Sequence, residues 1–379
     1  MKVTTHSRRP DPMLLVRQAF SPRANAGAAI LIFVTVILLA ATTLLVSATS
    51  VNQGAAQREF DNAGVLGQAK QSLLGYALMQ GVPGTLPCPD TNGDGLQNQT
   101  AAGCQNQLGL LPTRTLNLPP LTDSSGARLW YAVSLNLVAN APGLKNSSSP
   151  ANLQLDGQAA VALVIAPGGA INGQARRQLV MADFLEGINA DADLTNYASL
   201  LSTNNNDQLV TLSPGPYWSL VERRVAIEAT ALIRRYKTAC GEFPWAANFG
   251  GPYTSVINQQ SGAPPFNTAL PNNWGAICTS GTAPQPVAWL VNHWQDQLLY
   301  AMCRTAEGAC LNLIGAVPAT AASILVTPGI ALATQSRPDT DPADYFEAEN
   351  ISLPATQYRK RVPINHSSIY NDLSASLQP

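Results

Sequence analysis

Hydrophobic and polar positions follow a helical period over the first fifth of the chain. Residues 28–48 form an apolar run without a charged side chain, and no proline interrupts the chain between Pro22 and Pro83. Beyond this run, apolar residues recur every three or four positions with polar residues mostly between them. The pattern predicts one helix from Ala28 to Gln80, about 80 Å long at 1.5 Å per residue. Glycines cost about 1 kcal/mol each in a helix, so we expect a local break near Gly64–Gly67.

The apolar run is long enough to cross a bilayer. About 20 residues of helix span about 30 Å, which is the thickness of the hydrocarbon core. Basic residues gather before the run and none follows it until Arg58. The positive-inside rule therefore predicts an N-terminus in the cytoplasm and the rest of the chain on the other side.

The remaining chain alternates short apolar runs with loops rich in Gly, Pro and Asn. We expect a strand around Arg128–Leu137, a buried strand in the run that ends before Pro167, and a further strand over Gln208–Leu212. From Pro216 to Ala239 the pattern returns to a helical period, with one apolar and one charged face.

Part of the sequence repeats at a constant offset of 161 residues. Ala162–Gly168 matches Ser323–Gly329, and several polar residues downstream recur at the same distance. These matching pairs are Gln174 with Gln335, Arg176 with Arg337, Glu186 with Glu347 and Asn189 with Asn350. The repeat predicts an α+β fold: a long N-terminal transmembrane and amphipathic helix followed by two tandem helix–loop–β modules. Their predicted boundaries are residues 49–205 and 206–379. In each module, we expect the Gln and Arg to orient the turn after the buried strand, for example by bonding the acidic residue downstream.

Composition limits the function classes. Charged residues make up 12% of the chain and the formal net charge is −1. Without a basic patch beyond the leader and short runs such as residues 359–361, nucleic-acid binding is not supported. No GxSxG, HExxH or phosphate-cradling glycine motif occurs. His293, near Asp296, is the one position where a base could lie beside an acid, and packing or structural hydrogen bonding explains a single histidine equally well. We therefore expect no catalytic residues.

All six cysteines follow the apolar run. An even number of cysteines in an oxidising compartment predicts disulfides, although six allow 15 pairings. Sequence proximity favours three pairs, Cys88–Cys104, Cys240–Cys278 and Cys303–Cys310. Metal ligation is the alternative, but there is no CxxC pair and there are only three histidines.

The N-terminus resembles that of the type IV pilin and pseudopilin family. The shared features are a basic leader ending in Gly27, an apolar span that begins at Ala28, and an amphipathic continuation. The resemblance implies a leader over 1–27, cleavage by a prepilin peptidase between Gly27 and Ala28, methylation of the new N-terminus, and a transmembrane part over 28–48. It also implies pilin-like modules. The leader is longer than in many pilins.

One departure from the family pattern concerns the fifth residue after the cleavage site. Most members carry a glutamate there, which neutralises the charged N-terminus of a neighbouring subunit, whereas this chain has Ile32. In the family this absence is associated with minor, tip-type subunits. A plain signal anchor without processing is the alternative. A secretory signal peptide ending near Ala48 and a twin-arginine signal at Arg8–Arg9 fit less well.

The sharpest local motif is DTNGDGLQN. Asp90, Asn92, Asp94 and Asn98 place oxygen atoms at loop positions 1, 3, 5 and 9, as in an EF-hand-like calcium loop, but position 12 is Ala101 instead of glutamate. Calcium is therefore a possible cofactor, and a structural turn is the alternative. A second acidic segment, residues 339–349, is expected to be a solvated face.

Together these features predict a non-enzymatic minor pilin or pseudopilin-like subunit of a type IV pilus or type II secretion filament. The predicted partners are the prepilin peptidase, other pilin or pseudopilin subunits, inner-membrane assembly proteins and the lipid bilayer. The predicted localisation is a single-pass protein of a bacterial inner membrane, with its C-terminal region in the periplasm or on an extracellular filament. The alternative is a permanently anchored periplasmic or surface binding protein or adhesin.

Overall fold

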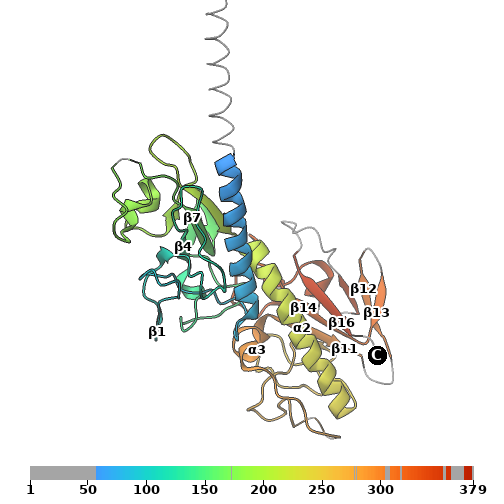
Figure 1. Cartoon of the computed structure of the whole chain (residues 1–379). Coiled ribbons are helices and arrows are strands. Elements are labelled where there is room, and N and C mark those ends of the chain that lie inside the picture. The colour runs from blue at the N-terminus through green and yellow to red at the C-terminus, as the bar shows by residue number, and fades with distance from the viewer. Residues whose placement is uncertain are drawn as a thin grey trace, which may run out of the picture. The chain divides into compact units, whose positions relative to one another are not determined.

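Two four-stranded sheets with the same antiparallel layout carry the fold (Figure 1). The computed structural model describes residues 57–171, 173–276, 278, 280–303, 308–315, 318–352, 356–359 and 371–377. The first sheet has the order β3 (Leu108–Leu110), β4 (Trp130–Val133), β7 (Ala162–Ala166) and β9 (Gln208–Leu212). The second has the order β10 (Ser261–Gly262), β11 (Leu299–Met302), β14 (Ser323–Thr327) and β16 (Leu373–Leu377). We call the described residues from 60 to 212 the first module and those from 214 to 377 the second module.

The two sheets also agree in register. Tyr131 of β4 faces Val164 of β7, and Tyr300 of β11 faces Leu325 of β14. Both central strands, β7 and β14, are buried along their whole length. Because both faces of these strands are covered, their sequences are runs of mostly apolar residues and do not alternate.

Each module also has a small three-stranded sheet. In the first module the order is β6 (Gln158–Ala160), β5 (Leu153–Leu155) and β8 (Asn196–Tyr197). In the second it is β13 (Ala319–Ala321), β12 (Leu311–Ile314) and β15 (Gln357–Arg359). In both sheets the middle strand pairs antiparallel with one neighbour and parallel with the other. A separate two-stranded ribbon joins β1 (Gln99–Thr100) to β2 (Gly103–Cys104).

Helices complete the described structure. The chain is helical over residues 57–79, through Gly64 and Gly67, so the predicted break there is absent. The other α-helices are α2 (Pro214–Cys240) and α3 (Ala288–His293). The 3₁₀ helices are η1 (Leu135–Leu137), η2 (Met181–Asp183), η3 (Gly187–Ala190), η4 (Gln295–Gln297), η5 (Pro342–Asp344) and η6 (Ala348–Ile351).

Helix α2 matches the predicted second helix, and its ends follow from local chemistry. Its first turn contains Pro214 and Pro216, whose fixed φ angle suits the start of a helix. It ends at Gly241, which adopts a left-handed conformation with φ 81° and donates its N–H to the carbonyl of Lys237.

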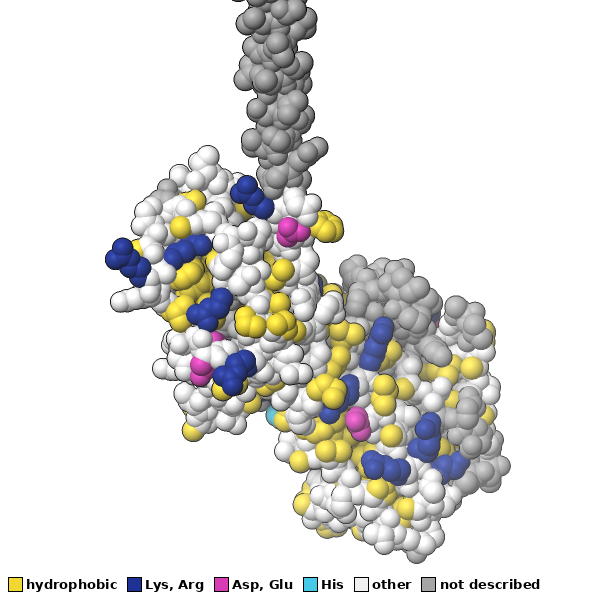
Figure 2. All heavy atoms as spheres, in the orientation of Figure 1, with side chains coloured by type: hydrophobic (Ala, Val, Ile, Leu, Met, Phe, Trp, Pro, Cys, Tyr) yellow, Lys and Arg dark blue, Asp and Glu magenta, His cyan; other side chains and the backbone are white. Residues whose placement is uncertain are grey.

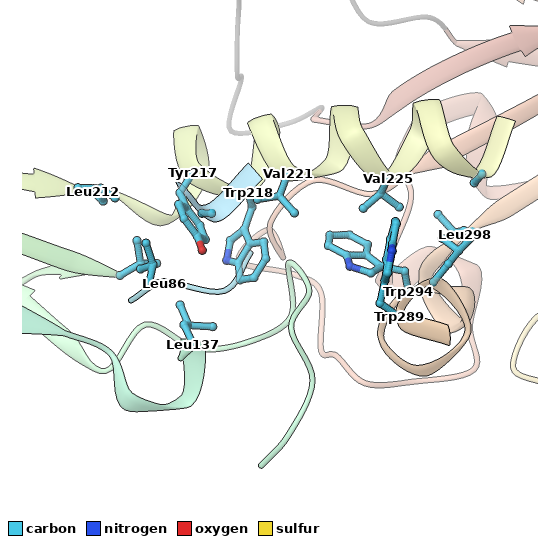
Figure 3. Packing of buried hydrophobic residues seen from close by; sticks show 14 of the residues in the cluster. Leu86, Leu137, Leu212, Tyr217, Trp218, Val221, Val225, Trp289, Trp294 and Leu298 are labelled. Carbon is cyan, nitrogen blue, oxygen red and sulfur yellow. The ribbon is translucent and has the colours of Figure 1, made fainter. Parts of the chain in front are cut away.

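The two modules share one hydrophobic core, and α2 runs through it. Tyr217, Trp218 and Val221 of α2 lie with Leu86 and other residues of the first module (Figure 3). Further along α2, Val225 lies near Trp289, Trp294 and Leu298 of the second module (Figure 3). The indole of Trp218 meets that of Trp294 edge to face at 6.1 Å between ring centroids. The described residues from Phe60 onward accordingly form one compact unit.

Polar contacts reinforce this junction. The side-chain amide of Asn146 donates to the carbonyl of His293 at 2.7 Å, and Gln297 hydrogen-bonds the hydroxyls of Ser147 and Ser148 at 3.1 and 2.6 Å. Arg224 of α2 donates to the carbonyls of Leu78 and Gln80, at the C-terminal end of the helix over 57–79. A cation at that end complements the helix dipole.

The predicted fold class was wrong in its organising element. The prediction placed a long transmembrane and amphipathic helix before two pilin-like modules, whereas the described residues form an α+β structure built mainly from several sheets, with three α-helices. Residues 28–48, which carried the transmembrane prediction, lie outside the described residues. Within the described ranges no helix is long and apolar enough to cross a membrane. The physical reason is plain in α2, which carries seven charged side chains, and in residues 57–79, where exposed Gln and Gly alternate with buried apolar residues.

The same finding corrects the predicted localisation. A single-pass protein of a bacterial inner membrane needs a spanning helix, and the described part of the chain contains none.

Candidate functional site

The predicted calcium loop is a compact turn organised around one buried carboxylate. Asp90 is 1% exposed, and its two carboxylate oxygens accept the backbone N–H groups of Asn92, Gly93 and Gly95 at 3.2, 2.6 and 2.7 Å. The carboxylate of Asp94 accepts the N–H of Leu96 at 2.7 Å. The sequence therefore folds into a series of Asx turns that satisfy most of these oxygens internally.

The fourth predicted ligand, Asn98, also has a structural partner. Its side-chain carbonyl accepts both the backbone N–H and the hydroxyl of Thr91, at 2.6 and 2.9 Å. In the described part of the chain, no group of three or more His, Cys, Asp or Glu side chains is placed to hold a metal ion. Calcium binding stays a prediction, and the alternative of a structural turn explains every contact of the loop.

Two arginines cover the same loop, and the motif alone gave no sign of them. Arg128 donates to the carbonyl of Gly93 at 2.9 Å, and Arg114 donates to the carbonyl of Asp94 at 3.1 Å. These guanidinium groups hydrogen-bond carbonyl oxygens that a cation could otherwise use as ligands, and they add positive charge beside the carboxylates. Both effects disfavour a cation at this position.

The six cysteines form the three disulfides that the sequence predicted. They join Cys88 to Cys104, Cys240 to Cys278 and Cys303 to Cys310. The other predicted site, the Gly27–Ala28 processing junction, lies outside the described residues.

His293 forms part of the junction between the modules. Its Nδ1 accepts the backbone N–H of Lys145 at 3.4 Å, and its own carbonyl accepts the amide of Asn146. Burial and the nearby Lys145 lower the pKa of His293. These contacts assign the histidine a structural role.

A buried polar cluster occurs once in each module. In the first module, Gln174 donates to Glu186 at 2.8 Å, and Arg176 donates to the carbonyl of Gly168 at 2.7 Å. The same bonds in the second module join Gln335 to Glu347 at 3.0 Å and Arg337 to Gly329 at 2.6 Å. As expected, each Gln bonds the acidic residue downstream, whereas each Arg bonds the turn after the buried strand and the Gln side chain and not the acidic residue itself.

Two further members of each cluster were missed by sequence analysis. Asp207 accepts the backbone N–H of Glu186 at 3.1 Å and the amide of Asn189 at 3.0 Å. Its counterpart Asp372 accepts the backbone N–H of Glu347 at 3.0 Å and the amide of Asn350 at 2.9 Å. Asn206 and Asn371, which precede the two aspartates, donate to the carbonyls of Gly169 and Ile330. The aspartates are separated by 165 residues instead of 161, so the repeat at constant offset does not reach them.

Burial governs the electrostatics of these clusters. Both aspartates are 0% exposed. Burial, together with the adjacent Glu186, raises the pKa of Asp207 to about 7. Burial and the neighbouring Glu347 likewise raise the pKa of Asp372 well above its usual value.

The outer face of the helix over 57–79 is rich in glycine. The inner face contributes Leu66, Ala69, Leu73 and Ala77 to the core. The opposite face carries three glycines, and a Cβ atom added at Gly64, Gly67 or Gly75 would meet nothing within 4 Å. At the two ends of this face, Phe60 is 76% exposed and Met79 is 83% exposed. We call this surface the glycine face.

Charge does not mark a binding surface for a polyanion. On the side of the molecule drawn in Figure 2, Lys and Arg side chains are spread over the surface between hydrophobic and uncharged polar ones, with a few of them near one another at the lower right. The glycine face holds mostly apolar, glycine and glutamine residues, and its one charged position is Asp61 near the N-terminal end of the described helix, so most of its length suits an apolar, closely approaching partner.

Comparisons with known proteins add no family to this picture: no protein-family model, curated protein or solved structure matches the chain.

Proposed function

We propose that this chain is a non-enzymatic minor subunit of a filament of the type IV pilus or type II secretion kind. In this proposal it is processed by a prepilin peptidase between Gly27 and Ala28 and contacts other pilin or pseudopilin subunits. The observation that carries the proposal is the glycine face of the helix over 57–79. The resemblance of the N-terminal sequence supports it independently.

The argument from the glycine face is energetic. A glycine inside a helix costs about 1 kcal/mol relative to alanine, so three of them weaken this helix by about 3 kcal/mol. No contact among the described residues requires their small size, because the space beyond each one is open. A second helix packed on this face would require it, since the distance between helix axes depends on the side chains at the contact.

The two large apolar residues at the ends of the face fit the same explanation. Phe60 and Met79 lie about five turns apart on one helix and are mostly exposed. Their burial against a neighbouring subunit would release apolar surface from water, at about 25 cal/mol per Å². A packed partner therefore gains from both the glycines and their apolar flanks.

The test separates assembly from folding. Gly64→Leu and Gly75→Leu should leave the isolated protein as stable as the wild type or more stable, because leucine is the better helix former and its Cβ atom meets nothing within 4 Å. Both variants should fall out of filaments sheared from the producing cells, as measured by immunoblot. Arg223→Leu, which adds the same side chain to an exposed position of α2, is the matched control and should assemble normally.

Two results contradict the proposal in different ways. If both leucine variants are incorporated into filaments as well as the wild type, the glycine face is not the assembly surface. N-terminal sequencing that finds an intact Met1 in cells with active prepilin peptidase would remove the processing step and favour a binding protein that is never assembled.

A further inference from the structure

The two carboxyl groups of each buried cluster are supplied with hydrogen-bond donors unequally. In the first module, Glu186 accepts Gln174 on one oxygen and the backbone N–H of Asn206 on the other, at 2.8 and 3.2 Å. Asp207 accepts both of its donors, from Glu186 and Asn189, on the single oxygen Oδ2. Among the described residues, no donor reaches its other oxygen, Oδ1, which is fully buried.

The second module repeats this inequality. One oxygen of Glu347 accepts Gln335 at 3.0 Å, and the other accepts the backbone N–H groups of Asn371 and Asp372 at 2.9 and 3.2 Å. Asp372 Oδ2 accepts the backbone N–H of Glu347 and the amide of Asn350, while the buried Oδ1 has no hydrogen-bond partner within the described chain. An ionised buried oxygen without a donor is costly, whereas a protonated one becomes a donor itself.

The charges around the clusters do not neutralise both carboxyl groups. In the first module the facing groups are Glu186 and Arg176, and Arg176 donates to Gly168 and Gln174. Asp123 lies at the same end of the sheet, where it accepts the N–H of Gly168. The cluster therefore contains more carboxyl groups than guanidinium groups.

The second module has the same imbalance. Arg337 donates to carbonyls, including those of Gly329 and Tyr345, and the nearby acidic groups are Glu347, Asp372 and Glu222 of α2. Among the described residues of this cluster, the one guanidinium group of Arg337 lies near two carboxyl groups, those of Glu347 and Asp372. In a buried site two adjacent carboxyl groups cannot both ionise cheaply, so one retains its proton.

We propose that each cluster holds one proton between its two carboxyl groups, on Oδ1 of Asp207 or Asp372, which donates it to the neighbouring glutamate. The duplicated pair then acts as a proton-dependent lock on the last strand of each main sheet. Asp207 directly precedes β9 and Asp372 directly precedes β16. The lock ties the start of each strand to the segment that contains Glu186 or Glu347.

The pH dependence follows from linkage. The aspartate pKa is raised in the folded state, to about 7 for Asp207, against about 3.9 in an unfolded chain. Between these values the folded protein binds more protons than the unfolded one, so stability falls as pH rises. The lock at Asp207 should raise the unfolding equilibrium constant by up to tenfold per pH unit within this window, and the lock at Asp372 should act in the same direction above the unfolded-state pKa. Neither contributes to the slope below about pH 4.

The decisive variants replace the proposed acid with a neutral isostere. In Asp207→Asn and Asp372→Asn, an amide N–H₂ can donate where the carboxylic acid donates, and Oδ remains for the two existing donors. Each variant should have a lower unfolding constant than the wild type at pH 8. Relative to the wild type, each should also lose up to tenfold per pH unit of dependence between pH 5 and 6.5. The comparison between variant and wild type cancels the opposite contribution of His293, whose pKa is lowered by burial.

Asp156→Asn is the matched control. This aspartate lies at the surface, and hydrogen bonds from Ser199 lower its pKa, so its removal should leave the slope above pH 5 unchanged. The stability of each cluster variant is expressed as its difference from the wild type at the same pH. If this difference is less favourable at pH 8 than at pH 5 for both variants, both carboxyl groups are ionised in the wild type and the proposal is overturned. If the variants do not fold, infrared spectra of the wild type decide: a buried carboxylic acid C=O band that persists at pH 6 supports the lock, and its absence overturns it.

Discussion

The two modules have the same internal arrangement of strands and differ in the helix that covers it. Both have the same strand order, the same register between the two central strands, and the same buried polar cluster. Their covering helices are unlike: the helix over 57–79 leaves one face open, whereas α2 contacts β14 and β16 of the second module and also enters the core of the first. The parts that repeat are the buried central strands and the buried polar clusters, where close packing and the need to hydrogen-bond every buried polar group restrict the sequence.

The difference between the helices is also a difference in expected role. The glycine face of the helix over 57–79 contributes little to stability through contacts within the chain. Helix α2 is buried on two sides and contributes contacts to both modules. We therefore expect residues 57–79 to contact other subunits and α2 to make the two modules unfold together. The following predictions test this division, beginning with the largest effect.

Trp218→Ala should destabilise the protein more than any other change considered. The side chain is 1% exposed and packs between Tyr217 and Trp294, so its truncation leaves a cavity that should cost about 3–5 kcal/mol. The same indole also lies against Gly84 of the first module, so denaturant unfolding should stay a single transition shifted to lower denaturant. Ile227→Ala on the same helix, at a residue 69% exposed, should change stability by about 0.5 kcal/mol or less. A biphasic curve with one unshifted phase would show that the modules unfold separately.

The second prediction concerns the stability lost when each disulfide is removed. The second module holds the bridges with separations of 38 and 7 residues, and the first holds one with a separation of 16. Loop-closure entropy predicts losses of roughly 4 kcal/mol for Cys240–Cys278, roughly 3 for Cys88–Cys104 and roughly 2 for Cys303–Cys310. Paired serine variants, measured by urea unfolding, should follow this order. A larger loss at Cys88–Cys104 than at Cys240–Cys278 would mean that native contacts outweigh chain entropy here.

Much of the repeated interior could be predicted from the sequence. The apolar run of β7 and the strand β9 come from unbroken or alternating apolar residues, and the fixed offset locates their counterparts. Predicting a strand over Arg128–Leu137 was too generous, because β4 ends at Val133 and a 3₁₀ turn follows. Short strands of this kind are specified by their neighbours in the sheet more than by local pattern.

The polar clusters show where sequence analysis failed. Gln174 and Glu186 lie close together in sequence and repeat at one offset, so their pairing could be expected. Asp207 reaches Glu186 across a loop whose length differs between the modules, and a partnership of that kind depends on the folded path of the chain. The arginines over the Asp90 turn were missed for the same reason, since Arg128 is 35 residues from Gly93.

The smallest predicted effect tests whether equal geometry means equal energy. The hydroxyls of Tyr131 and Tyr300 are buried at matching positions and donate to the carbonyls of Pro87 and Pro244 at 3.1 and 3.0 Å. Tyr131→Phe and Tyr300→Phe each leave a carbonyl without its donor, and each should cost about 1 kcal/mol in urea unfolding. Tyr76→Phe is the control: its hydroxyl accepts a long bond of 3.4 Å from Gln97 at a half-buried site and should cost less. A difference of more than about 1 kcal/mol between the losses at the two buried tyrosines would mean that the modules kept their register while their stabilities diverged, since both hydroxyls donate to a proline carbonyl at nearly the same length.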